Sequence, residues 1–179
     1  MMMERAKIAK QAEFDGLCGI YCLVNAVRNW NEEFFDPEDA DSLRYMLEAA
    51  DRLGLFTVHR VMKGFEPHEL IDIFNEFARA HRFPGKALHL SSMAEALNKW
   101  KFSCQAKRVF EQSGQIVIPV DKDDHWVLAY RHDYDQPGVF VEDSDGTNER
   151  PRIEYSDVRH KGRVGVLLLP ADCTISFPE

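Results

Sequence analysis

The sequence predicts an α+β fold in which a helical first half packs on a mostly antiparallel β-sheet formed by the second half. Two observations predict it. Up to about residue 100, apolar residues recur at helical spacing, whereas after about residue 109 short β-branched or aromatic runs alternate with turn residues. Helices followed by strands are typical of the α+β class. A length of 179 residues suits a single domain, with a helical lobe over about 1–102 and a sheet lobe over about 103–179.

Helices are expected at four places in the first half. They are Cys18–Trp30, about 36–53, about 67–81 and about 92–100. The first is apolar enough to be mostly buried. The second has strong boundary signals, because Asp36 suits an N-cap, Pro37 suits the first helical position and Gly54 suits the stop. The fourth begins with a capping box of Ser92 and Glu95.

Strands are expected at four places in the second half. They are Gln115–Val120, 125–131, 139–142 and 163–169, each bounded by Asp, Pro or Gly turns. Residues 131–138 (RHDYDQPG) are expected to connect two of them as a hairpin. The cleft between a helical lobe and such a sheet is a natural place for a binding or catalytic site.

Composition and charge exclude several classes of function. The net charge of −8 disfavours binding to nucleic acid or to an anionic membrane, so neither is expected as a partner. The longest apolar stretch is far shorter than a membrane span, and no apolar run follows the N-terminal charges as in a secretory signal. Four cysteines are too few for a disulfide scaffold, so we expect a protein of the reducing cytoplasm.

Cys18 is the first candidate for chemistry, since it begins the first expected helix. A thiol at a helix N-terminus faces the positive end of the helix dipole and the N–H groups of the first turn, and both favour the nucleophilic thiolate. Gly19 follows it and is expected to leave room for a substrate beside the sulfur. The alternative is that Cys18 is a small buried apolar residue, as most free cysteines are.

Three polar residues complete a candidate constellation. His125 opens an expected strand, where its ring suits a general base and acid. Asp143 ends the next strand, so antiparallel pairing would bring it beside His125 to orient the imidazole; Asp145 is the competing carboxylate, and this stretch also suits a β-turn. Gln11 precedes Cys18, and its side-chain N–H suits an oxyanion site together with the Cys18 N–H. Each signal alone fits a surface or turn position, but their order along the chain combines them.

This order resembles the papain-like cysteine peptidases, and within them the bacterial double-glycine leader peptidases and related domains. The resemblance rests on Gln11, residues 15–19 (DGLCG), residues 125–128 (HWVL) and residues 141–143 (VED). It does not extend to residues 36–101. Ser follows Asp143, where the leader peptidases commonly have Pro.

The resemblance implies a papain-like thiol hydrolase that cleaves a peptide or amide bond of a peptide or protein substrate through a thioester acyl-enzyme. In that reading Cys18 attacks, His125 moves the proton, Asp143 orients His125 and Gln11 helps to bind the oxyanion. The same residues would also serve a glutamine deamidase, a transglutaminase-like acyl transferase or a cell-wall amidase. A peptide-binding module without catalytic activity is the alternative from a different class.

Neither a metal nor an organic cofactor is expected. Cys22 lies four residues after Cys18, but no second pair of ligands at zinc-site spacing follows it. Core packing is therefore favoured over a metal site or a redox pair for Cys22, Cys104 and Cys173. The chain has no Gly-rich phosphate loop, and the sequence does not indicate an oligomeric state.

Overall fold

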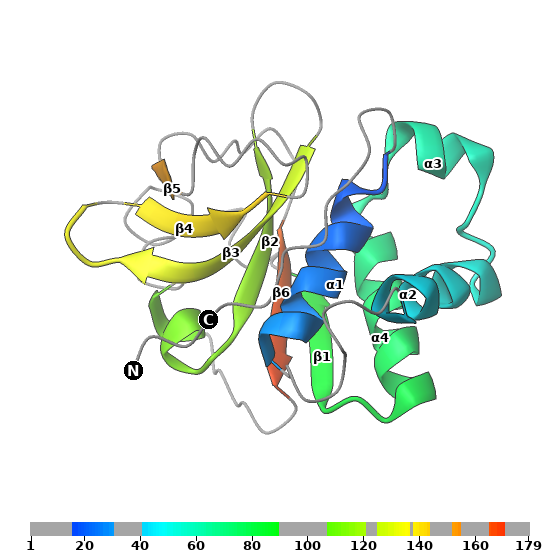
Figure 1. Cartoon of the computed structure of the whole chain (residues 1–179), viewed down its shortest axis with the longest axis horizontal. Helices are drawn as coiled ribbons and strands as arrows, with labels where there is room; N and C mark the ends of the chain where they lie inside the picture. The colour runs from blue at the N-terminus through cyan, green and yellow to red at the C-terminus, as the bar shows by residue number, and fades with distance from the viewer. Residues whose placement is uncertain are drawn as a thin grey trace.

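Helices come before most of the strands in the described part of the chain. The structure, a computed structural model, describes residues 16–30, 41–89, 107–120, 125–136, 138–143, 152–154 and 165–170. Its helices are α1 (Cys18–Trp30), α2 (Asp41–Arg52), α3 (Val58–Lys63) and α4 (Pro67–His81), with a further helical turn at 107–111. Helix α1 lies between the sheet and α2, and α4 runs beside both (Figure 1).

The strands form one antiparallel sheet. They are β1 (Gly85–His89), β2 (Gln115–Val120), β3 (His125–Asp133), β4 (Gly138–Glu142), β5 (Arg152–Glu154) and β6 (Val166–Pro170). Their order across the sheet is β1-β6-β2-β3-β4-β5. The pairs β2–β3 and β3–β4 connect neighbours in sequence, whereas β6 returns to lie between β1 and β2. Strand β3, which begins with His125, is therefore central.

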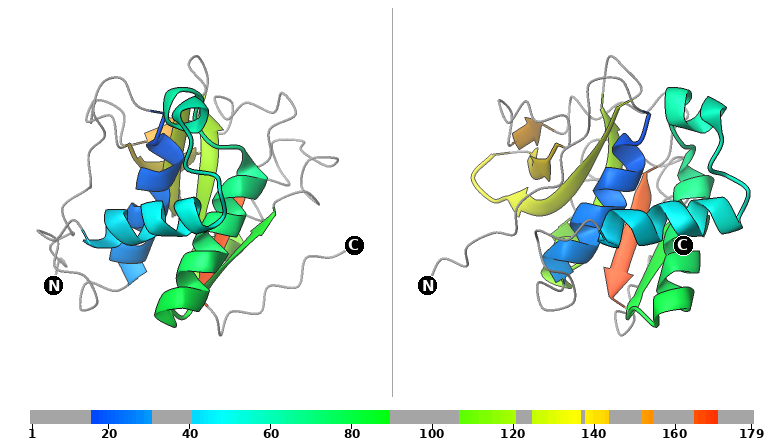
Figure 2. Two further views of the ribbon diagram at one scale, coloured as in Figure 1. Left: turned by 90° about the vertical axis from the view of Figure 1, so that its right-hand side faces the viewer. Right: turned by 45° about the vertical axis from the view of Figure 1, so that its right-hand side comes forward.

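The two faces of the sheet are covered differently. Side chains alternate along β3, so Trp126 and Leu128 pack in the core shared with the helices, while Val127 and Ala129 pack on the other face. Val109 of the helical turn covers that second face. The larger core lies between α1, α4 and the sheet, and the left view of Figure 2 shows these helices in front of the strands. It fixes the position of α1 relative to β3.

The helix ends follow from local sequence. Gly54 ends α2 with a φ of +69°, a conformation that glycine adopts without steric cost, and its N–H donates to the Asp51 carbonyl at 2.8 Å. Pro67 occupies the first turn of α4, and the Glu69 carboxylate accepts a hydrogen bond from the Glu66 N–H at 2.7 Å. These signals are all local, which is why sequence patterns find them.

The structure confirms the α+β class and most of the expected elements. The helices at 18–30 and 67–81 and the strand at 115–120 have the expected bounds. Four elements were not expected: α3, β1, β5 and the helical turn at 107–111. Strand β1 lies in the half predicted to be helical, and residues 131–133 extend β3 rather than forming part of the hairpin connection. Residues 36–40 and the helix expected at 92–100 lie outside the described residues.

No helix within the described ranges combines the length and the apolar character needed to span a bilayer.

Candidate active site

A hydrogen bond joins the first residue of β3 to the residue that follows β4. The pairing of Leu128 with Glu142 sets β3 and β4 antiparallel, so that the end of β4 returns beside the start of β3. As a result His125 Nε2 lies 2.7 Å from Asp143 Oδ1. The expected pairing of these two side chains is therefore present in the structure, while Asp145 lies outside the described residues.

Cys18 is the third member of this group. It is the first residue of α1, and α1 packs against β3. The Cys18 side chain lies close enough to the His125 ring to raise the pKa of the imidazole. Because Nε2 is engaged by Asp143, Nδ1 is the ring nitrogen left for the sulfur. Three residues that are far apart in the sequence are thus brought together, with the imidazole next to both the carboxylate and the thiol.

The two neighbours of His125, Asp143 and Cys18, favour the charged form of its imidazole. Burial would lower the pKa of His125, but the hydrogen bonds to Asp143 and Cys18 and the negative charges of both groups outweigh it and raise the pKa to about 10. His125 is then an imidazolium at neutral pH. Cys18 is only 4% exposed, whereas the His125 and Asp143 side chains are 17% and 25% exposed. Solvent therefore reaches the group mainly from the histidine and aspartate side.

Cys22 lies one turn further along α1 and differs from Cys18 in environment. It is completely buried, and burial together with the negative charges of Cys18, Asp143 and Glu142 raises its pKa well above the usual range. Cys22 therefore stays a neutral thiol and packs in the larger core, as the sequence analysis predicts. Cys104 and Cys173 lie outside the described residues.

A partly buried polar network supports the carboxylate end of the site. Glu142, which precedes Asp143, is 5% exposed and accepts a hydrogen bond from Asn29 Nδ2 of α1 at 3.0 Å. The second Asn29 amide hydrogen goes to Gln115 Oε1 at 3.0 Å, and Gln115 Nε2 donates to the Ala26 carbonyl at 3.0 Å. The end of β4 is thereby tied to α1, the helix that carries Cys18. None of these residues was expected at the site, although Gln115 and Glu142 stand out as polar residues in otherwise apolar strands.

The turn that leads into α1 is held by the end of α3. The Gly16 N–H donates to the Val61 carbonyl, and a β-carbon at Gly16 would lie only 2.7 Å from that oxygen. Glycine is needed there because backbone fills the space where a side chain would be. The same segment contacts β3, since the Trp126 indole N–H donates to the Phe65 carbonyl at 3.2 Å. Residues 61–65 thus contact both Gly16, two residues before Cys18, and Trp126, the residue after His125.

Gly19 has a different role from the one expected. A β-carbon at this position would lie 2.8 Å from Leu70 Cδ2. The missing side chain therefore lets α1 and α4 pack closely, and the space that was expected to admit a substrate is occupied by Leu70. Gln11 lies outside the described residues, so its expected place at the oxyanion site is a prediction only.

The site has the composition of a nucleophile with a paired base, and within the described residues no group of three or more His, Cys, Asp or Glu side chains is placed to hold a metal ion. An intrahelical bond first appears in α1 where the Tyr21 N–H donates to the Leu17 carbonyl at 3.0 Å. The N–H of Cys18 lies before this bond, in the turn where helices leave donors for other partners.

A comparison with known protein families and with curated proteins finds no match.

Proposed function

We propose that this protein is a cysteine-dependent hydrolase that cleaves a peptide or amide bond in a peptide or protein substrate. One observation carries the proposal: His125 lies next to both Asp143 and Cys18, and Cys18 begins a buried helix. A nucleophile beside a base that is itself oriented by a third group is the arrangement used for covalent acyl transfer. The order of helix and sheet around it supports a papain-like fold as part of the proposal.

In the first half of the reaction the Cys18 thiolate attacks the carbonyl carbon. A C–S bond forms, and the electron pair of the C=O bond moves onto oxygen. The N–H of Cys18 is suited to bind this oxyanion, and Gln11 is the expected second donor. The intermediate collapses when the C–N bond breaks and the imidazolium of His125 gives its proton to the leaving amine. The product of this half is a thioester on Cys18 and a neutral His125.

In the second half water replaces the amine. His125, now neutral, takes a proton from water as the hydroxyl oxygen attacks the thioester carbon. The second oxyanion collapses by breaking the C–S bond, which releases the carboxylic acid and restores the Cys18 thiolate beside imidazolium. Asp143 keeps the ring aligned through Nε2 in both halves and stabilises its positive charge. The cycle needs no metal or organic cofactor.

The proposed chemistry also favours a compartment. Cys18 and Cys22 are both free thiols in the structure. A thiol nucleophile is lost when it is oxidised beyond the sulfenic acid, so we infer that the enzyme works in a reducing compartment such as the cytoplasm.

The proposal is tested with a peptide library derived from a digested proteome. The wild-type protein is expected to produce new amino termini, and Cys18→Ala and His125→Ala are each expected to produce about 10³-fold fewer, since residues of such a group act as a unit. Intact-mass measurement during turnover should show the acyl adduct on the wild-type protein only. Cys22→Ala is the matched control, because it removes a neighbouring thiol that takes no part in the reaction. Cleavage that persists in Cys18→Ala would contradict the proposal.

A further inference from the structure

Exposed apolar side chains concentrate in one short segment near Cys18. Six large hydrophobic side chains are exposed within the described residues, and four of them belong to residues 53–62: Leu53, Phe56, Val58 and Met62. Val58 is 83% exposed and Met62 is 66% exposed. Exposed apolar residues scattered singly are normal on a protein surface, whereas four within ten residues of sequence are not scattered and need an explanation.

The fold does not use these side chains. Helix α3 has no buried residue. It is held by polar contacts: the Thr57 hydroxyl accepts from the Arg60 N–H at 3.3 Å, the Gly64 N–H donates to the Arg60 carbonyl at 2.7 Å, and the Arg60 guanidinium pairs with Glu69 of α4 at 2.7 Å. Val58 and Met62 can therefore change without loss of the core, so their exposure is not explained by packing.

Helix α3 also contacts the turn that leads into Cys18 of the proposed active site. The Val61 carbonyl accepts a hydrogen bond from the N–H of Gly16, two residues before Cys18. In Figures 1 and 2 the first turn of α1, the start of β3 and α3 lie at the same end of the molecule. Helix α3 therefore lies on the same side of the molecule as the carbonyl of a polypeptide bound at Cys18 would.

Charge on α3 adds a second element of recognition. Residues four apart share one face of a helix, so Val58 and Met62 form an apolar stripe and His59 and Lys63 form a polar stripe beside it. Arg60 is paired with Glu69, but no acidic side chain among the described residues pairs with His59 or Lys63. The whole chain carries a net charge of −8. A local cation in such a chain is complementary to a carboxylate on the partner.

We propose that α3 is the substrate-recognition element of this enzyme. It binds a polypeptide that has a large apolar side chain, which packs on Val58 and Met62, next to an acidic side chain, which lies near Lys63. The inference rests on the proposed function and adds a substrate class to it: peptides with an apolar and an acidic residue close to the cleaved bond.

Binding to the Cys18→Ala variant tests the substrate class without turnover. Three pools of fluorescent peptides are compared by anisotropy: apolar with acidic, apolar with basic, and polar with acidic. The first pool should bind at least about tenfold more tightly than the third. Burial of about two methylenes of the peptide's apolar side chain on α3 is enough for this difference. Adding Lys63→Glu should weaken the first pool about fivefold and strengthen the second, as expected for reversal of one exposed charge.

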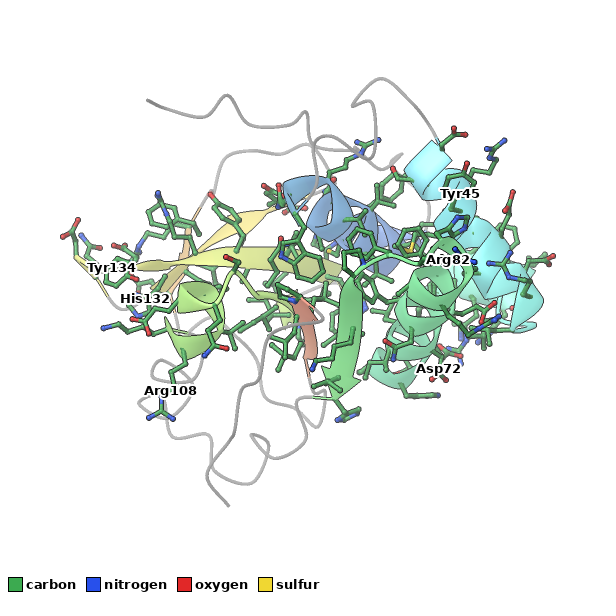
Figure 3. The ribbon with its side chains drawn as sticks, turned by 90° about the horizontal axis from the view of Figure 1, so that it is seen from below. Tyr45, Asp72, Arg82, Arg108, His132 and Tyr134 are labelled. Atoms are coloured by element: carbon green, nitrogen blue, oxygen red, sulfur yellow. The ribbon has the colours of Figure 1, made fainter. Side chains whose placement is uncertain are left out.

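A double variant of α3 and a control variant elsewhere on the surface separate this recognition from general effects. Val58→Ser with Met62→Ser should remove the preference for apolar residues, and the unfolding midpoint in urea should not change because both side chains are exposed. Tyr134→Ser is the matched control, since Tyr134 is 67% exposed on the hairpin end of the sheet, opposite α2 and α4 (Figure 3). Equal binding of all three pools, or a preference unchanged by the α3 variants, would overturn the inference. Thiol-dependent cleavage could still be present in that case, and would leave the proposed function standing.

Discussion

His125 lies between two groups that stabilise its positive charge. Asp143 bonds Nε2 at 2.7 Å, and Cys18 is the partner on the other side. With a pKa of about 10, the ring is protonated over the physiological range, which is the state that a thiolate–imidazolium pair requires. The pKa in the folded protein lies above the ordinary 6.5, so the pairing contributes stability that is fully present below about pH 6.5 and is lost as the pH rises through about 10.

At this scale we predict a change in the pH profile of the Asp143→Asn variant. Asparagine removes the charge beside Nε2, so the pKa of His125 falls and the alkaline limit of activity moves from about pH 10 to a lower pH. The rate at pH ~7 should fall about 100-fold or more, in the range found for loss of an acid–base group. The measurement is kcat/KM from pH ~5 to ~11. Asp72→Asn, on the exposed surface of α4 (Figure 3), is the control. An alkaline limit that does not move would contradict the role given to Asp143.

Helix α1 is positioned by two glycines that allow two kinds of close approach. At Gly16 the neighbour is backbone, the Val61 carbonyl, which cannot move without displacing α3. At Gly19 the neighbour is the end of the buried Leu70 side chain, which can shift only if the core around it repacks. The thiol of Cys18 lies between these two contacts along the chain, so its distance from His125 depends on both.

The two contacts predict different costs for alanine at these positions. Gly16→Ala should lower the free energy of unfolding by about 1–3 kcal/mol, as overpacking against rigid atoms does. Gly19→Ala should lower it by less than Gly16→Ala does, because the new β-carbon meets a side chain, which can repack, and not backbone. Urea unfolding of both variants measures the difference. A larger loss for Gly19→Ala than for Gly16→Ala would contradict this description of the turn before Cys18.

Elements with strong periodicity and clear boundary residues were predictable from the sequence, and those without them were not. The helix at 67–81 begins at a proline and repeats apolar residues at helical spacing, so its bounds were found. Helix α3 has only six residues and buries none of them, so its apolar residues at 58, 61 and 62 are too few to predict a helix from spacing alone. Strands β1 and β5 are short edge strands, of five and three residues, that depend on β6 and β4 for their pairing. Such elements are set by tertiary contacts that a local pattern does not contain.

At the scale of the whole molecule, the candidate site is formed where the start of α1 meets the start of β3. The sequence predicted the meeting of Cys18, His125 and Asp143, because a cysteine at a helix start and two adjacent strand ends are local features. It did not predict the support from Asn29 and Gln115, or the link from Trp126 to Phe65, because no cap, turn or motif in the sequence marks these residues. The network holds the two halves of the site in register.

The most direct test of the account is the reactivity of the Cys18 thiol as a function of pH. Wild-type protein and His125→Ala are treated with iodoacetamide, and labelling of Cys18 is separated from that of Cys22 by fragment mass spectrometry. The account predicts rapid alkylation of Cys18 at about pH 6, slowed about tenfold or more in His125→Ala, because a paired imidazolium keeps the sulfur as thiolate. His89→Ala, on the exposed edge strand, should behave as wild type. Slow alkylation with a midpoint above about pH 8, equal in wild type and His125→Ala, would contradict it and favour a binding module without catalytic activity.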